Sequence, residues 1–299
     1  TASAPSTAAP GAAQSAAGGS SASARAVSEA IEAIAAKGGR TALVAAVHEA
    51  CSFLEGDAEK GGRSDEDWEK RTAALRSIPS ILERGAACAC LDALIDGLHK
   101  YLAVQVADLR SQVVRAACAV LSEVGTAHGK AVLPLIVGVM PKLLANCYVT
   151  VKAISEASHT TALTLVTAAP VAATLSVLLS HASDSHAKAR LGCAEYISAL
   201  LTAAGGSAAG GGGVSERQVG SILAALKSLA GDADAGVRQA AAKCFWVVHA
   251  TWPIQAEALK AKLDPSQVKL LGRHAPTAAG AAKPKPSAAK PWAKAARKA

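Results

Sequence analysis

The chain has 299 residues, of which 51% are hydrophobic and 18% charged, and its formal net charge is +8. Its start has no charged segment followed by an apolar run, and no uninterrupted apolar stretch is long enough to cross a membrane. The seven cysteines lack zinc-ligand spacing, because Cys88 and Cys90 would lie on different helix faces and no second pair follows. We therefore expect a reduced, intracellular protein that has no membrane span.

The two ends differ from the middle in composition. Residues 1–24 are almost entirely Ala, Ser, Gly, Pro and Thr, which offer too little apolar surface to offset the entropy of ordering. Residues 275–299 are rich in Ala, Pro and Lys, a composition typical of an extended linker. We predict a disordered segment at 1–24, a folded domain at 25–274 and a disordered basic tail at 275–299.

The excess positive charge is concentrated in that tail. Seven basic residues and no acidic ones follow Gly272, which leaves the rest of the chain nearly neutral. Such a tail is attracted to any polyanion, whether nucleic acid, anionic lipid or an acidic protein surface. It identifies no partner by itself.

Apolar residues recur at helical spacing throughout the middle of the chain. A helix is expected at 26–36, and Leu43, Val47, Cys51 and Leu54 indicate another at 40–54. The helix pairs that follow from this spacing are 40–54 with 65–84, 88–102 with 109–124, 130–145 with 151–167, 170–180 with 187–203, 215–230 with 236–249, and a short closing pair 256–263 with 265–271. Acidic residues 65–67 and Asp108 are placed to cap second helices. A Gly-rich break at 205–213 separates the fourth pair from the fifth.

A basic residue recurs near the start of the second helix of each pair. The five copies, at steps of 44, 37, 38 and 48 residues, are Arg71, Arg115, Lys152, Arg190 and Arg238. A period of about 40 residues in an all-helical pattern is the signature of HEAT-type repeats. The predicted fold is all-α, an α-solenoid of about six HEAT-like helix pairs, and its work is expected to be binding.

In such a stack the turns within the pairs line up along one edge, which is the candidate binding surface. A turn Asp and an Arg early in the second helix can instead hold the stack together by charge-assisted hydrogen bonds. The residues that fit this use are Asp108 before Arg115, Asp184 before Arg190, and Asp232 with Asp234 before Arg238. We interpret Arg115 and Arg190 as structural, whereas Lys152, which has no such Asp, is available to a partner.

Trp68 is surrounded by charged residues on both sides. Burying that segment would require the desolvation of several charges, so an exposed ring is favoured, and an exposed indole is a frequent binding hot spot. The alternative is a ring folded back onto the first pair as a lid.

No catalytic motif is present. The chain has no HExxH, P-loop, GxSxG or dinucleotide-binding glycine motif, and residues 210–213 lack the lysine that a phosphate loop needs. The eight histidines show no ligand spacing, with His181 and His186 the nearest to one. We expect no enzymatic activity, no cofactor and no metal.

Three segments together resemble the TOG domain of CLASP-type microtubule regulators: Asp67–Leu75, Asp108–Cys118 and Lys243–His249. The resemblance covers about residues 60–272 and implies a flat paddle of six HEAT repeats whose turns bind tubulin. Carried over to this chain, the implied tubulin-binding residues are Trp68, Lys70, Arg110, Ser111, Lys152, Lys188, Arg190 and Arg238. The third repeat follows the family pattern loosely, and the Gly-rich insertion is longer than expected.

The resulting hypothesis is a tubulin- and microtubule-binding domain in the cytoplasm and cytoskeleton that regulates microtubule growth or stability. Tubulin is acidic, so basic turns would steer it to the edge. A ciliary or axonemal version stays open, as does a general HEAT scaffold that binds other proteins. A specific nucleic-acid binder is disfavoured, because the predicted domain is nearly neutral and has no stripe of aromatic and basic residues.

Overall fold

The computed structural model describes residues 67–87, 91–170, 172–205 and 214–276, and these are helical apart from short connections. The helices are α2 (Asp67–Ala87), α3 (Leu91–Val106), α4 (Ser111–His128), the 3-10 helix η1 (Gly129–Val132), α5 (Leu133–Asn146), α6 (Lys152–Ala168), α7 (Ala172–Ser180), α8 (Ala187–Gly205), α9 (Glu216–Ala230), α10 (Ala235–Thr251), α11 (Pro253–Lys260) and α12 (Pro265–Arg273). The all-α solenoid expected from the sequence is confirmed.

The predicted helices from 65–84 onward are all found, with ends that differ from the expected ones by up to four residues. The helix expected at 256–263 begins at Pro253 and ends at Lys260, because proline is well suited to the first turn of a helix. Helix α2 continues past Pro79. The helices expected at 26–36 and 40–54, the Gly-rich insertion and both terminal segments lie wholly or mainly outside the described residues.

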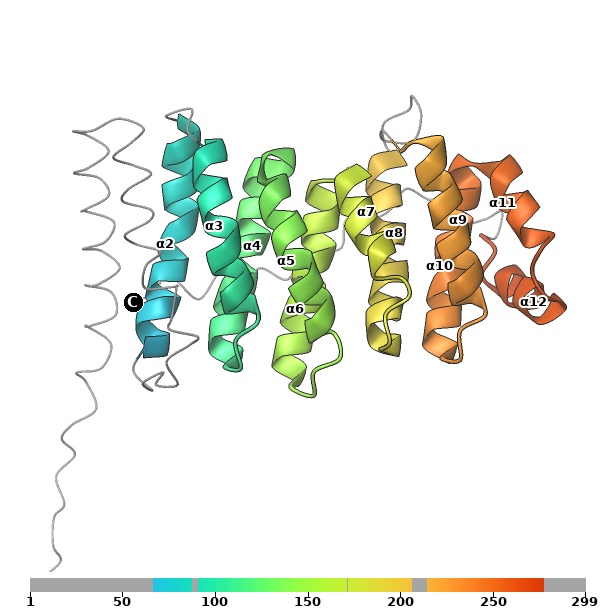
Figure 1. Cartoon of the computed structure of the whole chain (residues 1–299), viewed down its shortest axis with the longest axis horizontal. Coiled ribbons are helices and arrows are strands. Elements are labelled where there is room, and N and C mark those ends of the chain that lie inside the picture. Colours follow the sequence, from blue (N-terminus) through green and yellow to red (C-terminus); the bar gives the residue numbers. More distant parts are fainter. Residues whose placement is uncertain (1–66, 88–90, 171, 206–213, 277–299) are drawn as a thin grey trace, which may run out of the picture.

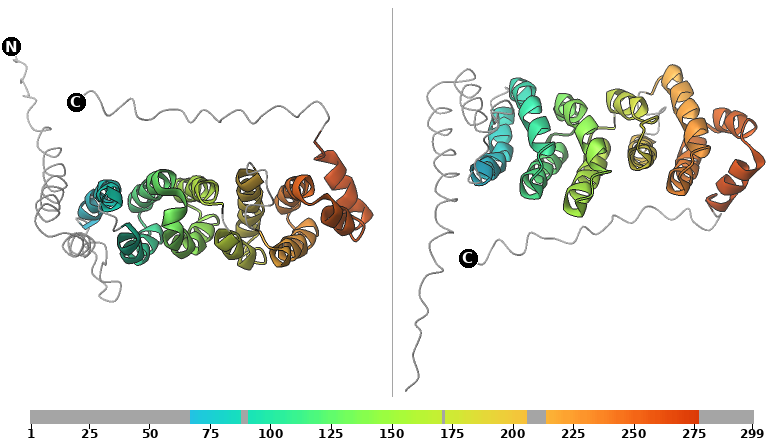
Figure 2. Two further views of the ribbon diagram at one scale, coloured as in Figure 1. Left: turned by 90° about the horizontal axis from the view of Figure 1, so that it is seen from above. Right: turned by 60° about the horizontal axis from the view of Figure 1, so that its bottom comes forward.

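The helices form two layers (Figures 1 and 2). Helices α2, α4, α6, α8 and α10 pack side by side in one layer, and α3, α5, α7 and α9 form the other, while α11 and α12 close the C-terminal end. Each second helix runs in the opposite direction to its partner, so the turns within pairs lie along the lower edge of Figure 1. This arrangement confirms the expected single row of turns.

Small residues let neighbouring second helices approach closely. Ala117, Ala162 and Ala194, in α4, α6 and α8, are fully buried. A Cβ added to Gly125 in α4 would lie 2.6 Å from a methyl carbon of Leu165 in α6, so the two helices leave no room for a side chain there. These buried alanines are thus packing residues of the layer of second helices.

Uncharged polar groups join the middle of the stack. The side-chain amide of Asn146 donates to the carbonyl of Val106 at 2.9 Å and to Ser158 at 3.0 Å. Thr161 donates to the carbonyl of Cys118 at 3.0 Å. These buried groups are satisfied across the interface between the second and third pairs, which fixes their register.

One apolar stretch, Ser111–Asn146, is long and apolar enough to pass a composition test for a membrane span. It is not one straight helix. It is α4, η1 and α5, and the chain reverses at Gly129, whose φ of +54° lies in the left-handed region that favours glycine. Its apolar residues line the core between the two layers. Core helices of a stack of helix pairs have such an apolar composition.

A buried ion pair joins the first described helix to the second pair. The Nη1 atom of Arg71 lies 2.7 Å from the Asp108 carboxylate and 3.0 Å from the Gln105 side-chain oxygen. Arg71 and Asp108 are 3% and 7% exposed. This pair corrects the sequence-based assignment of Asp108 to Arg115.

Arg115 is exposed and takes part in no hydrogen bond or ion pair among the described residues. In the later pairs the structural arginine follows the turn Asp by six residues. In the second pair that place is held by the buried Val114, and Arg115, one residue further on, turns to solvent. A shift of one residue rotates a helix position by about 100°, which explains the error.

We expect Asp108→Ala to lower the free energy of unfolding by about 3–5 kcal/mol, because it leaves the Arg71 charge buried without its carboxylate. Arg115→Ala, seven residues further on, should change it by less than about 0.5 kcal/mol. Urea denaturation followed by circular dichroism measures both. Equal effects would contradict the assignment of the buried pair to Arg71.

Candidate protein-binding edge

The turn edge consists of the loops 107–110, 147–151, 181–186 and 231–234 together with the first turns of the helices that follow them. It runs along the lower side of Figure 1. It carries the residues that the sequence singled out in pairs two to five.

An aspartate organises three of these loops. Asp108, Asp184 and Asp232 each accept a hydrogen bond from the backbone N–H two residues further on, at 2.8, 2.8 and 2.9 Å. In the loop of the third pair, 147–151, the corresponding residue is Val149, so that loop lacks this bond. The other three loops are therefore Asx turns, which fix the chain just before the second helix begins. Asp108 precedes the cap position, Arg110, by two residues and is not the cap itself.

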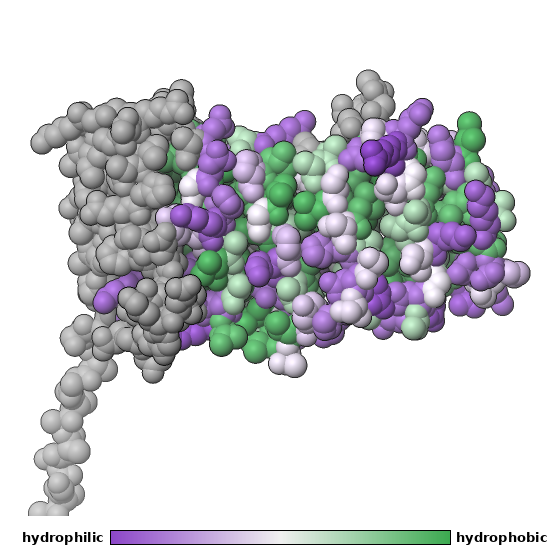
Figure 3. All heavy atoms as spheres, in the orientation of Figure 1, coloured by the Kyte–Doolittle hydropathy of each residue, from purple (hydrophilic) through white to green (hydrophobic). Residues whose placement is uncertain are grey.

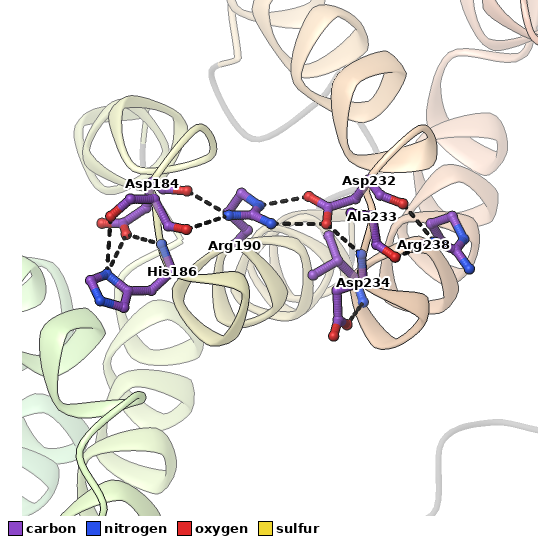
Figure 4. Close-up of polar contacts among 9 residues, drawn as sticks. Asp184, His186, Arg190, Asp232, Ala233, Asp234 and Arg238 are labelled. Atoms are coloured by element: carbon purple, nitrogen blue, oxygen red, sulfur yellow. Dashed lines mark hydrogen bonds and ion pairs between the residues drawn. The ribbon is translucent and has the colours of Figure 1, made fainter.

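Arg190 is fully engaged within the stack (Figure 4). Its Nε and Nη2 donate to the two carboxylate oxygens of Asp232 at 2.6 and 2.9 Å. Its Nη1 donates to the backbone carbonyls of Asp184 and Ser185 at 2.8 and 2.9 Å. Arg190 thus ties its own turn to the turn of the next pair. These contacts confirm the structural role expected for Arg190, and all three guanidinium nitrogens already donate hydrogen bonds within the stack.

Arg238 repeats only half of this pattern. Its Nη1 donates to the carbonyls of Asp232 and Ala233 at 2.6 and 2.7 Å, the same two places in the turn that Arg190 uses. Its Nε and Nη2 bind no carboxylate in the part of the chain that the structure describes. In Arg190 the Nε and Nη2 atoms bind Asp232. In Arg238 the same two atoms are held in place by the Nη1 bonds but have no carboxylate partner among the described residues.

The other predicted basic residues are mostly open to solvent. Lys70 and Lys188 are exposed. The side chain of Lys152 is 84% exposed and lies 3.4 Å from Glu156 one helical turn on, a pair that is weak at such exposure. Arg110 and Ser111, at the start of α4, are half-buried.

Trp68 differs from its expectation. It lies near the start of α2, is half-buried and packs against the hydrophobic core. The sequence favours an exposed ring over one folded back onto the first pair. The half-buried ring lies between these two expectations, because the charged neighbours Glu69 and Lys70 face solvent while the indole packs on the core. Part of the ring remains accessible.

The turn edge also carries apolar side chains that the sequence analysis did not select. Leu109 is 93% exposed and Val151 47%. Figure 3 shows apolar residues gathered along the lower edge beneath α3 to α6. A large apolar residue next to a turn aspartate, such as Leu109 after Asp108, is the sequence signal that could have found them, since short turns between helices lie on the surface.

The described residues offer little chemistry for catalysis. Burial raises the pKa of Cys193 to about 12 and that of Cys244 to about 12, so both thiols stay protonated and unreactive. No group of three His, Cys, Asp or Glu side chains in the described ranges could hold a metal ion.

The fold and the edge define a class: a HEAT-like α-solenoid that presents basic and apolar side chains along one row of turns. The family model described as CLASP N terminal matches residues 46–272. The chain belongs to this CLASP N-terminal family, which is not a family of enzymes.

Similar curated proteins include CLIP-associating protein 1-B of Xenopus laevis, 30% identical over 225 residues that cover 70% of this chain and 14% of that protein. Protein stu-1 of Neurospora crassa is 24% identical over 242 residues, which cover 75% of this chain and 20% of that protein. The chain thus spans a small part of the length of these relatives.

Solved structures share the fold. A TOG domain of microtubule polymerases superposes with a TM-score of 0.56 and 16% identity, covering 71% of this chain and 44% of that one. A crescerin TOG domain gives a TM-score of 0.50 and 17% identity, covering 76% and 88%. These likenesses confirm the TOG-type paddle.

The Arg190–Asp232 pair predicts a pH dependence. Hydrogen bonding to Arg190 holds the pKa of Asp232 below its usual range near about 3.9. The pair therefore stabilises the fold fully above about pH 5, and this contribution is lost as the pH falls through the folded-state pKa.

We expect Asp232→Asn to lower the free energy of unfolding at neutral pH, with the difference from the native chain shrinking toward about pH 3. Denaturant unfolding at several pH values measures it. Asp264→Asn, which removes an exposed carboxylate before α12, is the matched control. A difference that does not depend on pH would contradict an ionic role for Asp232.

Proposed function

We propose that the chain is a tubulin-binding TOG domain of a CLASP-like regulator of microtubule growth or stability. The relatives and the fold support the partner, since TOG domains of solved structures with this fold recruit and bind tubulin. The turn edge supports the mode of binding. The observation that carries the proposal is the contrast between Arg190 and Arg238.

Arg190 demonstrates what this turn geometry does. With Nη1 anchored to two backbone carbonyls, the remaining face of the guanidinium binds the Asp232 carboxylate through two short bonds. Arg238 is anchored in the same way, by bonds of 2.6 and 2.7 Å. Its free face is thus preorganised for an external carboxylate, which reduces the entropy cost of binding one. An acidic partner such as tubulin supplies such carboxylates.

The rest of the edge fits a partner of the same kind. Lys152 and Lys188 lie at the first and second positions of α6 and α8 and face solvent. Between the basic residues, Leu109 and Val151 offer apolar area. Basic side chains increase the rate of encounter with an acidic protein, and desolvated apolar contacts slow dissociation. Lys70, Arg110, Ser111 and part of Trp68 complete the proposed contact set, without Arg190.

The proposal extends to the setting of the domain. Residues 25–274 form the proposed binding domain, between flanking segments 1–24 and 275–299, and the domain acts by binding and not by catalysis. The proposed location is the cytoplasmic microtubule cytoskeleton. A ciliary role is the second candidate, supported by the likeness to crescerin, which regulates microtubules in the primary cilium.

Arg238→Gln tests the preorganised site directly. We expect it to weaken tubulin binding about 10- to 100-fold, because a hydrogen bond to a charged group contributes about 1.5–3 kcal/mol. Arg217→Gln removes the same charge from an exposed arginine at the start of α9, at the opposite edge, and should leave binding near the native level. Affinity is measured with unpolymerised tubulin and the full chain.

Equal loss in both variants would show that net charge and not the turn edge governs binding. No binding by the native chain would remove the tubulin proposal and favour a scaffold for other proteins. Circular dichroism of Arg238→Gln excludes unfolding as the cause, since the substitution also removes two bonds to the α10 turn.

Lys152→Glu is a second test, chosen because this side chain takes no part in the core. We expect binding to weaken about 5- to 50-fold through repulsion from an acidic partner, with the unfolding midpoint nearly unchanged. Lys130→Glu reverses an exposed charge in η1, at the opposite edge, and is the control. Trp68 is less suitable, because it packs on the core and its substitution would change stability and binding together. Unchanged affinity of Lys152→Glu would remove the third turn from the proposed contact set.

A further inference from the structure

The turns of the third and fourth pairs, loops 147–151 and 181–186, are joined differently from the others; they are called the third and fourth turns below. The third turn has Val149 where the others have an aspartate, so it offers no carboxylate to a guanidinium. Tyr148 of that turn instead stacks on His186 of the fourth, with ring centroids 3.8 Å apart and planes 8° from parallel. The imidazole of His186 is thus part of the contact between two neighbouring turns of the edge.

The same imidazole faces a carboxylate. The His186 Nδ1 lies 3.3 Å from one oxygen of Asp184, which also accepts the His186 backbone N–H at 2.8 Å (Figure 4). The His181 Nδ1 lies 3.9 Å from the other oxygen. The Ser185 hydroxyl lies 3.1 Å from His186 Nδ1. A second imidazole and a hydroxyl therefore share the cluster with this pair.

Other charged groups surround the cluster at longer range. Arg190 in α8 donates hydrogen bonds to the backbone carbonyls of Asp184 and Ser185, and its charge is balanced by Asp232 of the next turn. Lys188, the second residue of α8, is exposed. The backbone bond from His186, followed by the other contacts of the histidines, lowers the pKa of Asp184. The carboxylate is thus ionised across the whole range in which histidines titrate.

We propose that His186, Asp184 and Tyr148 form a proton-linked clip, which tightens the contact between the third and fourth turns and strengthens binding at this edge when His186 is protonated. The binding half of this inference rests on the proposed function. The clip itself does not.

The direction follows from the geometry. Protonated His186 places a positive charge beside the Asp184 carboxylate and against the face of the Tyr148 ring, two favourable interactions that the neutral ring lacks. It also adds one positive charge to an edge that meets an acidic partner. Both effects require the protonated imidazole, so they weaken as the pH rises and the ring gives up its proton.

The test compares tubulin affinity at about pH 6 and about pH 7.5, at constant ionic strength, for the native chain, His186→Phe and His128→Phe. Phenylalanine can stack on Tyr148 but carries no proton. His128 ends α4 at the opposite edge and serves as the control. Dividing native by variant affinity at each pH removes the titration of tubulin itself. We expect this ratio for His186→Phe to rise about threefold at the lower pH, as for an exposed ion pair, and the ratio for His128→Phe to stay constant.

A second measurement needs no tubulin. NMR signals of the Tyr148 ring should move with pH in the native chain and lose that movement in His186→Phe, which keeps an aromatic ring at this place without a titratable nitrogen. Tyr148 signals that follow pH in a chain that binds no tubulin would keep the clip and remove the proposed function. A pH-independent affinity ratio for His186→Phe, or Tyr148 signals that ignore pH, would overturn the proposal.

Discussion

The second helices of this solenoid are held in register by one repeated interaction, in which a guanidinium of one pair grips the turn carboxylate of the next. Arg71 binds Asp108 in this way, and Arg190 binds Asp232. The same carboxylates also accept backbone N–H groups of their own turns. A single aspartate therefore shapes its turn and binds the preceding pair. Because Asp108 and Asp232 lie in loops of the turn edge, the positions of Leu109, Arg110 and Arg238 depend on this interaction.

This interaction uses up the charges that a reading of the sequence would assign to a partner. Each turn can bind outward only with groups that the stack does not need. Those groups are Arg238, where the series of carboxylates ends among the described residues, and Lys152, in the turn that has no aspartate. Leu109 belongs with them, since its turn is fixed while its side chain is 93% exposed. The proposed binding surface thus consists of the side chains that the Arg71–Asp108 and Arg190–Asp232 pairs do not use.

The helical spacing of apolar residues was enough to predict the pairs, because burying one face of each helix is the dominant energetic requirement. Spacing was not enough to identify the structural arginines. Arg115 and Arg71 look equivalent in sequence, yet one residue of offset from the turn places Arg115 in solvent and Val114 in the core. The partner of Asp108 lies 37 residues away and in the preceding pair, and no local pattern shows that direction. Trp68 was misjudged because neighbours on a helix face different ways.

The centre of the stack shows what replaces the ion pair when the sequence omits it. Where the third turn has Val149, the next pair is held by the Tyr196 hydroxyl, 3.0 Å from His159 and 3.4 Å from Cys147, and by the stack of Tyr148 on His186. Between about pH 5 and 8 the arginine and the aspartate of each outer joint both keep their charges, so these joints do not respond to protons in that range. An imidazole can change its charge there. Substituting aromatic and histidine contacts for a guanidinium therefore lets the joint in the middle of the edge respond to pH where the two Arg–Asp joints do not.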